Sequence, residues 1–169
     1  MGYNTIVPVF LIERFGASPG AMAALLATVG GANLFVQALL VRRLVARFGE
    51  RRMVVVSLLF QAAGLAALAL VPNFWLVYPI SALASAGAGP LRPALSALLA
   101  NAADANEQGR LNGVSAALAS LMSVVGPLWA GASYDALAPG APFWAGAVLL
   151  LLALVPLLGW RASVRPAEA

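Results

Sequence analysis

The sequence predicts an all-α fold, a polytopic bundle of membrane-spanning helices. Of its 169 residues, 62% are hydrophobic and 9% are charged, and the mean hydropathy is +0.91. A soluble domain usually has about 45–50% apolar and about 25% charged residues. One core of this length cannot bury so much apolar side chain and keep enough polar residues for its surface, so we expect lipid as the solvent. The chain also contains uncharged runs near the roughly 20 residues that a helix needs to cross a bilayer.

The first expected helix, residues 2–15, is a partial span. Gly2–Ile12 is apolar, but eleven residues rise only about 16 Å in a helix, about half of the hydrocarbon thickness. The segment has neither a basic n-region nor a cleavage site, so a signal peptide is not expected. We expect the last half of a membrane helix, with Glu13 and Arg14 at its exit.

Five complete spans are expected after this helix, all in one transmembrane domain. They cover residues 18–41, 53–71, 74–100, 111–134 and 143–160. The first of them begins at Ser18-Pro19, a capping residue followed by proline at the first helical position. Residues 53–91 form a run of 39 uncharged residues, and Pro72-Asn73 is the strong turn signal that divides it into two spans.

The arginines predict the topology. All ten basic residues are arginine, and five of them lie between Arg42 and Arg52. The positive-inside rule places such a cluster in the cytoplasm. Eight arginines then lie on the cytoplasmic side and only Arg14 on the opposite side, which predicts a cytoplasmic C-terminus. The net charge of +4 is explained by this topology, so we do not expect nucleic-acid binding.

The residue types that most catalytic sites need are missing. The sequence has no Cys and no His, which removes disulfides, the commonest general base and the commonest metal ligand. It also has no phosphate-binding loop. We therefore expect no enzyme activity, no cofactor and no metal site.

Polar side chains inside the spans are the binding-site candidates, because burying them in lipid is costly. Asn33 and Gln37 are four residues apart and share a helix face, and Gln61 lies in the middle of the next span. The competing interpretation is hydrogen bonding between amides of neighbouring helices. Arg92 is the one charge inside an expected span. It either snorkels to the cytoplasmic interface or faces a cavity, where it binds an anion or a carboxylate.

The segment VRRLVARFGERRM, residues 41–53, is the most specific motif. Gly49 can adopt a positive φ angle and so allow a tight reversal between two antiparallel spans. Arg47, Arg51 and Arg52 are placed to meet the C-terminal carbonyls of a helix or acidic groups on a neighbour. The alternative is a generic positive-inside loop.

The order of residues in this segment resembles the loop between the second and third helices of each half of a major facilitator transporter. The N-terminal copy in that family usually reads GxLaDRxGRR. Arg42 and Ala46 stand at its Gly and Asp positions, a degeneracy typical of the C-terminal copy. The stretches PALSALL (residues 93–99), EQGRLNG (107–113) and SVVGPL (123–128) are similar, in order and spacing, to helices ten and eleven of drug:proton antiporters of the tetracycline-efflux type.

The resemblance covers residues 6–156 and implies the C-terminal six-helix half of an alternating-access efflux transporter in a bacterial plasma membrane. The implied partners are the lipid bilayer, a small-molecule substrate, and either an N-terminal half or a second copy. In this fold the first and fourth helices of each half line the cavity, which adds Tyr3, Asn4, Tyr78 and Arg92 as cavity candidates. Together with the three amides named above, the full set of candidates is Tyr3, Asn4, Asn33, Gln37, Gln61, Tyr78 and Arg92. The implied gating loop consists of Arg47, Gly49, Glu50, Arg51 and Arg52.

Proton coupling has no evident carrier in these spans. When the sequences are aligned on the shared GERR, the similar tetracycline-efflux proteins have His at the position of Asn33 and Asp at the position of Gln61. This chain keeps polarity at both positions and lacks both titratable groups. The alternative function is a non-transporting remnant, or a small membrane protein that acts by packing against a partner helix.

Overall fold

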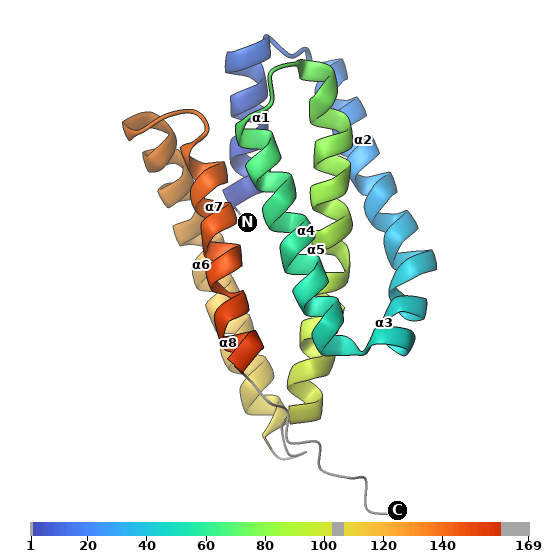
Figure 1. Cartoon of the computed structure of the whole chain (residues 1–169). Coiled ribbons are helices and arrows are strands. Elements are labelled where there is room, and N and C mark those ends of the chain that lie inside the picture. Colours follow the sequence, from blue (N-terminus) through green and yellow to red (C-terminus); the bar gives the residue numbers. More distant parts are fainter. Residues whose placement is uncertain (1, 103–106, 160–169) are drawn as a thin grey trace, which may run out of the picture.

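The computed structural model of the chain describes residues 2–102 and 107–159, and every regular element in this part is a helix (Figure 1). The elements in chain order are α1 (Gly2–Phe15), α2 (Pro19–Phe35), the π-helix η1 (Val36–Val41), α3 (Arg42–Phe48), α4 (Glu50–Ala69), α5 (Phe74–Ala102), α6 (Gln108–Ala136), α7 (Ala141–Leu152) and α8 (Leu154–Gly159). The predicted all-α membrane bundle is confirmed.

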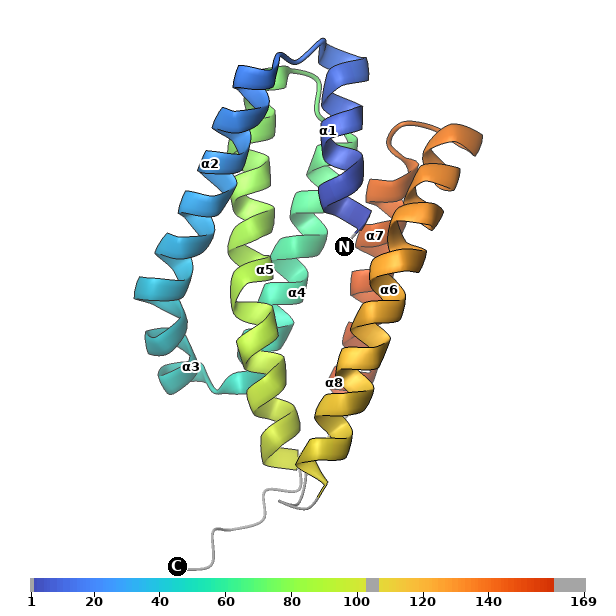
Figure 2. The same cartoon turned by 180° about the vertical axis from the view of Figure 1, so that it is seen from behind.

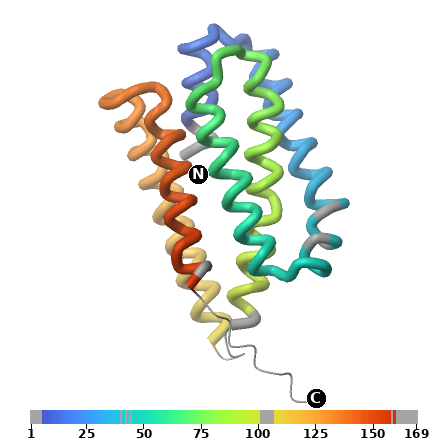
Figure 3. The backbone as a smooth tube through the Cα atoms, viewed as in Figure 1, coloured from blue at the N-terminus to red at the C-terminus, as the bar shows by residue number. Residues whose placement is uncertain are grey.

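The long helices lie alongside one another and reverse direction at short turns (Figures 1 and 3). Helix α4 is central, with its largest interfaces on α5 and α7, while α2 packs on α5 and α1 packs on α6. Figure 2 shows α2 and α6 at the two sides of the bundle. Helices α2 and α5 both run from the α1–α2 turn end toward the α3–α4 turn end, so these two neighbours are parallel.

Among the described residues, four helical segments are long and apolar enough to cross a membrane. They are Pro19–Leu39, Glu50–Ala69, Phe74–Ala100 and Gln108–Ala136. The last expected span, residues 143–160, corresponds to α7 and α8, which form a shorter apolar stretch, Ala141–Leu157, with a turn residue at Ala153. Helix α5 continues without interruption through Pro79, Pro90 and Pro93.

The start of α2 agrees with the sequence signal, but its end does not. The Ser18 hydroxyl accepts a hydrogen bond from the Ala21 backbone N–H at 3.3 Å, as an N-cap does. At the other end the chain stays helical through η1 and α3 as far as Phe48. The expected loop of residues 42–52 is therefore a helix–glycine–helix turn. Arginine is a good helix former, and the chain reverses at Gly49, whose φ angle is +78°.

Glycines allow α4 and α5 to approach each other closely. A Cβ atom on Gly64 would lie 2.5 Å from the Cβ of Ala84. One on Gly87 would lie 2.7 Å from the carbonyl oxygen of Ser57 and 2.8 Å from the backbone nitrogen of Gln61. Neither contact leaves room for a methyl group, so the interface depends on both glycines.

Aromatic side chains join α1 to the end of the bundle opposite the α3–α4 turn. Phe10 and Phe143 are fully buried, and their rings meet edge to face with centroids 5.1 Å apart. Phe15 and Phe74 extend this cluster to the start of α5. Edge-to-face pairs of this kind stabilise a fold by about 0.5–1.5 kcal/mol beyond the area they bury. The cluster therefore fixes α1 against α7 and α5.

Candidate functional site

Polar contacts join α2 and α5 at several levels along their interface. The Tyr78 hydroxyl on α5 donates a hydrogen bond to the carbonyl oxygen of Ala21 on α2, at 3.2 Å. About two turns further along both helices, the Ser85 hydroxyl lies 3.5 Å from the carbonyl oxygen of Val29. It also donates to the carbonyl oxygen of Ala82 at 2.9 Å. Because the helices are parallel, successive turns of α2 meet successive turns of α5 in a fixed register.

The next contact along this interface joins the predicted amides to α5. Asn33 accepts a hydrogen bond at its Oδ1 atom from the Nε2 atom of Gln37, at 2.7 Å. The same Oδ1 atom lies where a side chain on Gly89 would begin, 2.7 Å from an ideal Cβ position. Arg92 is one helical turn beyond Gly89, which brings it to the level of Gln37. We call Asn33, Gln37, Gly89 and Arg92 the amide–arginine site.

Two features make this site a candidate for binding a ligand or a partner. Gln37 and Arg92 are both exposed, and within the described chain the Arg92 guanidinium has no hydrogen-bond or ion-pair partner. Gln37 also lies in η1, the six-residue π-helix that follows α2. Short π-helical segments inside α-helices are uncommon and occur frequently at functional sites.

Gln61 belongs to a different interface. Gly87 contacts the Gln61 backbone on α4, whereas Gly89 contacts Asn33 on α2. These glycines are two residues apart, which is about 200° around α5, so Gln61 and Asn33 lie on opposite sides of that helix. The Oε1 atom of Gln61 and the Ser57 hydroxyl are buried with no hydrogen-bond partner among the described residues.

The remaining cavity candidates lie apart from the amide–arginine site. Tyr78 is eleven residues from Gly89 along α5, about 16 Å, and its hydroxyl is bonded to the α2 backbone. Tyr3 and Asn4 belong to α1, and their side chains lie outside the described part of the structure. The structure thus joins Asn33 and Gln37 and places Arg92 one turn beyond their contact with α5, whereas Gln61 and Tyr78 lie elsewhere.

The expected gating segment is fixed to α8, the last helix among the described residues. Both the Nε and Nη2 atoms of Arg51 donate to the carbonyl oxygen of Leu157, at 3.1 and 2.6 Å. Carbonyls in the last turn of a helix have no partner within it, so Arg51 satisfies one of them at the end of α8. The turn at Gly49 and the end of α8 are therefore held together.

The other residues of this segment lie around the Gly49 turn. Glu50 is in the first turn of α4, where a carboxylate is favourable to the helix dipole. The Arg47 guanidinium lies 5.9 Å from the centre of the Phe48 ring, and Arg52 is exposed. The segment therefore presents positive charge at this end of the bundle.

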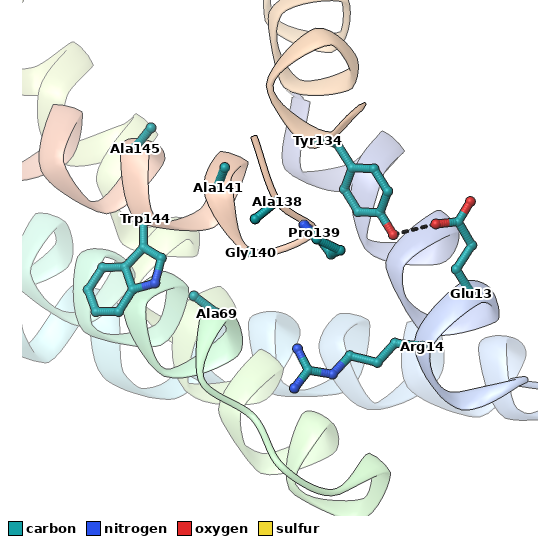
Figure 4. A pocket seen from close by; sticks show the side chains of 10 residues that line it. All are labelled: Glu13, Arg14, Ala69, Tyr134, Ala138, Pro139, Gly140, Ala141, Trp144 and Ala145. Carbon is teal, nitrogen blue, oxygen red and sulfur yellow. Dashed lines mark hydrogen bonds between the residues drawn. The ribbon is translucent and has the colours of Figure 1, made fainter. Parts of the chain in front are cut away.

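A cleft of about 930 Å³ lies at the opposite end of the bundle (Figure 4). Its lining comprises Glu13, Arg14, Ala69, Tyr134, Ala138, Pro139, Gly140, Ala141, Trp144 and Ala145. The Tyr134 hydroxyl donates to Oε2 of Glu13 at 2.5 Å, and the Arg14 guanidinium lies 5.4 and 5.7 Å from the ring centres of Phe10 and Phe15. Sequence reasoning missed this cleft, although the charged pair Glu13-Arg14 at the end of an apolar helix marked its position.

Comparison with known proteins identifies similar sequences over the whole chain. The sequence model of the Major Facilitator Superfamily matches residues 1–169. The class G tetracycline resistance protein of Vibrio anguillarum is 36% identical over 84% of the chain, and the class C protein of Escherichia coli is 36% identical over 86%. Multidrug resistance protein 2 of Bacillus subtilis is 28% identical over 99%. No solved structure gives a significant match.

The chain spans only part of the length of these relatives. It covers 37% of each of the two tetracycline resistance proteins and 41% of the Bacillus subtilis protein. All three names describe drug resistance, and all three proteins are bacterial.

Proposed function

The chain belongs to the Major Facilitator Superfamily, and from this we propose that it works as the C-terminal half of an alternating-access efflux transporter for small molecules. In such transporters two halves rock around a binding site near the middle of the bilayer. The observation that carries the proposal is the amide–arginine site on the parallel pair α2 and α5. The chain is an integral membrane protein, and we place it in the bacterial plasma membrane because its named relatives are bacterial.

The chemistry of this site suits a substrate that moves between water and the membrane. The side-chain amides of Asn33 and Gln37 share one hydrogen bond of 2.7 Å. Their other donor and acceptor positions stay available for a ligand. Arg92 has no anionic partner within the described chain, so its guanidinium needs water, a ligand or a partner chain to solvate it. A guanidinium beside two amides favours a substrate with anionic or hydrogen-bond-accepting oxygens.

Drugs of the tetracycline type are the first substrates to test. Two relatives with 36% identity have tetracycline resistance in their names, and the Bacillus subtilis relative has multidrug resistance. Asn33 and Gln61 lack a titratable group, so a proton carrier in these two positions is not part of the proposal.

An N-terminal half is the proposed partner, because two helices are little covered by the described residues of the chain. In the 18-residue apolar stretch of each helix, only 6% is buried in the α2 segment and in α6, compared with 50% in α4. Helix α6 also exposes a stripe of small and polar side chains at helical spacing: Asn112, Ser115, Ala119 and Ser123. Small residues four apart let helices pack closely in a membrane, and hydroxyl and amide groups favour protein over lipid contact. This stripe supports a helix of another half as the neighbour of α6.

Co-expression tests the proposal. The chain is produced with the N-terminal half of the class G tetracycline resistance protein in bacteria that lack their own drug efflux, and tetracycline accumulation is measured. We expect accumulation to fall only when both halves are present. Arg92→Gln should restore accumulation, whereas Arg110→Gln, which removes an exposed arginine at the start of α6, should not.

Two results would contradict the proposal. The first is unchanged accumulation when both halves are inserted in the membrane and co-purify. The second is transport by strictly monomeric chains in liposomes. Transport by a dimer of the chain alone would replace the N-terminal half with a second copy as partner.

A further inference from the structure

We infer that the cleft lined by α1, α6 and α7 binds the headgroup of a zwitterionic phospholipid whose polar group is a phosphoethanolamine. This binding site is separate from the amide–arginine site, and it does not depend on the proposed transport function. Three sides of the cleft supply the three parts of such a ligand: a guanidinium, a carboxylate and an apolar wall (Figure 4).

The position of the cleft matches the headgroup layer. Glu13 and Arg14 are in the last turn of α1, Tyr134 is in the last turn of α6, and Gly140 caps the start of α7. All of these helix ends lie at one end of the bundle, opposite the turn at Gly49 (Figure 1). Helices that cross the hydrocarbon end in the interfacial layer, where lipid headgroups are found.

Arg14 supplies the binding group for a phosphate. Its side chain is exposed, and among the described residues it has no carboxylate partner. Figure 4 shows it extending into the cleft, away from Glu13. The guanidinium rests over the rings of Phe10 and Phe15, which position it without neutralising its charge. A planar guanidinium donates two parallel hydrogen bonds to phosphate oxygens, which makes it well suited to a phosphodiester.

Glu13 supplies the binding group for an ammonium. The Tyr134 hydroxyl occupies one position on Oε2, at 2.5 Å, and orients the carboxylate. An ionised carboxylate has about four acceptor positions, so most of them stay available. A primary ammonium donates up to three hydrogen bonds and a quaternary choline none. The site therefore favours ethanolamine over choline headgroups.

Glu13 and Arg14 do not neutralise each other. They are consecutive on α1, so their side chains leave the helix about 100° apart. In Figure 4 the carboxylate is turned toward Tyr134, while the guanidinium extends away from it into the cleft. The two charges are therefore presented separately, as a zwitterionic headgroup requires.

The apolar wall of the cleft accommodates the start of an acyl chain. Ala141 and Ala145 leave the face of α7 shallow, and Trp144 beside them is 45% exposed. Tryptophan is enriched at membrane interfaces, where its ring spans polar and apolar layers. A soluble phosphate would use Arg14 alone, whereas a lipid uses Arg14, Glu13 and this wall together.

Native mass spectrometry of the delipidated chain in mild detergent tests the inference. The probes are phosphatidylethanolamine, phosphatidylcholine and phosphatidylglycerol with the same acyl chains, together with glycerophosphoethanolamine and inorganic phosphate. We expect phosphatidylethanolamine to be retained about tenfold better than the other two lipids, since the difference is one charge-assisted contact. Arg14→Gln and Glu13→Gln should each remove this preference.

Matched controls separate the site from general charge effects. Glu107→Gln and Arg110→Gln remove the same charges at the other end of the bundle and should leave the preference unchanged. Arg14→Lys keeps the positive charge and should retain part of the preference, which guards against a folding defect in Arg14→Gln. Equal retention of phosphatidylcholine, or an undiminished preference in both Gln variants, would overturn the inference. Binding of inorganic phosphate as tight as that of the lipid would show a simple anion site instead.

Trp144 offers a second readout. A chain with Trp75→Phe, Trp129→Phe and Trp160→Phe keeps Trp144 as its only tryptophan. In vesicles, we expect phosphatidylethanolamine with brominated acyl chains to quench its fluorescence more strongly than brominated phosphatidylcholine at the same fraction. Arg14→Gln in this background should equalise the two. Equal quenching before that substitution would contradict the site.

Discussion

Arg51 binds the carbonyl oxygen of Leu157 through two of its nitrogens, at 3.1 and 2.6 Å, although the two residues are 106 positions apart. The contact joins the first turn of α4 to the last turn of α8 and so ties these two segments together at one end of the bundle. The carbonyl has no partner within its own helix, and charge-assisted hydrogen bonds are stronger than neutral ones. Arg51 therefore has a structural role, whatever part the segment plays in gating.

We predict that Arg51→Ala lowers the free energy of unfolding by about 1.5–3 kcal/mol, the usual contribution of hydrogen bonds to a charged group. The neighbouring Arg52→Ala removes an exposed arginine and should change stability by less than about 0.5 kcal/mol. Unfolding of the purified chain in mixed micelles, followed by tryptophan fluorescence, measures both. Equal stabilities of the two variants would show that the contact with Leu157 contributes nothing.

We predict that Gly49→Ala destabilises the chain by about 1–2 kcal/mol. Nothing lies within 4 Å of the added Cβ, so the cost comes only from the φ angle of +78°, which residues with a side chain rarely adopt. Gly30→Ala in α2 is the matched control, because its surroundings are equally open and its backbone is helical. That change should be neutral or stabilising by up to about 1 kcal/mol. The same unfolding assay applies, and a destabilised Gly30→Ala would contradict the argument.

Much of the fold follows from the sequence because lipid imposes simple constraints. Apolar run lengths and the Pro72-Asn73 turn predict the membrane helices, and the Ser18 cap is found where its sequence signal lies. The arginine-rich segment is where this reasoning fails. Charge density predicts a position outside the hydrocarbon but not a loop, since arginine is also a good helix former. The chain therefore stays helical up to Gly49, the residue whose conformation ends α3.

The candidate site could be predicted only in part, because helix pairing is not encoded in single-helix patterns. The spacing of Asn33 and Gln37 predicts their shared face, and the structure adds their 2.7 Å hydrogen bond. Their position opposite Gly89 depends on the parallel packing of α2 and α5, and no local signal gives that. The same holds for Gln61, which has the polarity of a site residue but lies across α5 in the α4 interface.

We predict opposite consequences for two glycines that are two residues apart on α5. Gly87→Ala places a methyl group against the backbone of Ser57 and Gln61, which cannot move aside, so stability should fall by about 1–3 kcal/mol. The nearest atoms that Gly89→Ala meets belong to the amide end of Asn33, which can rotate away. Its stability loss should stay below about 1 kcal/mol, while the Asn33–Gln37 pair is displaced.

Transport distinguishes these two variants further. In the two-half transporter, Gly89→Ala should raise the substrate concentration needed for half-maximal transport, and Gly87→Ala should instead reduce the amount of folded protein. Gly113→Ala, with open space around it on α6, serves as the control for both assays. Wild-type affinity in Gly89→Ala would remove the amide pair from the binding site.

Cysteine labelling tests the orientation, and the absence of native cysteine makes it direct. Arg52 is exposed beside the Gly49 turn, and Asp135 is exposed in the last turn of α6 at the other end of the bundle. If the arginine-rich segment is cytoplasmic, Asp135→Cys should react with a membrane-impermeant maleimide in intact cells. Arg52→Cys should react only after the membrane is permeabilised. The reverse pattern would overturn the cytoplasmic placement of the segment. It would also overturn that of the C-terminus, because α7 and α8 return the chain to the same end as the Gly49 turn (Figure 1).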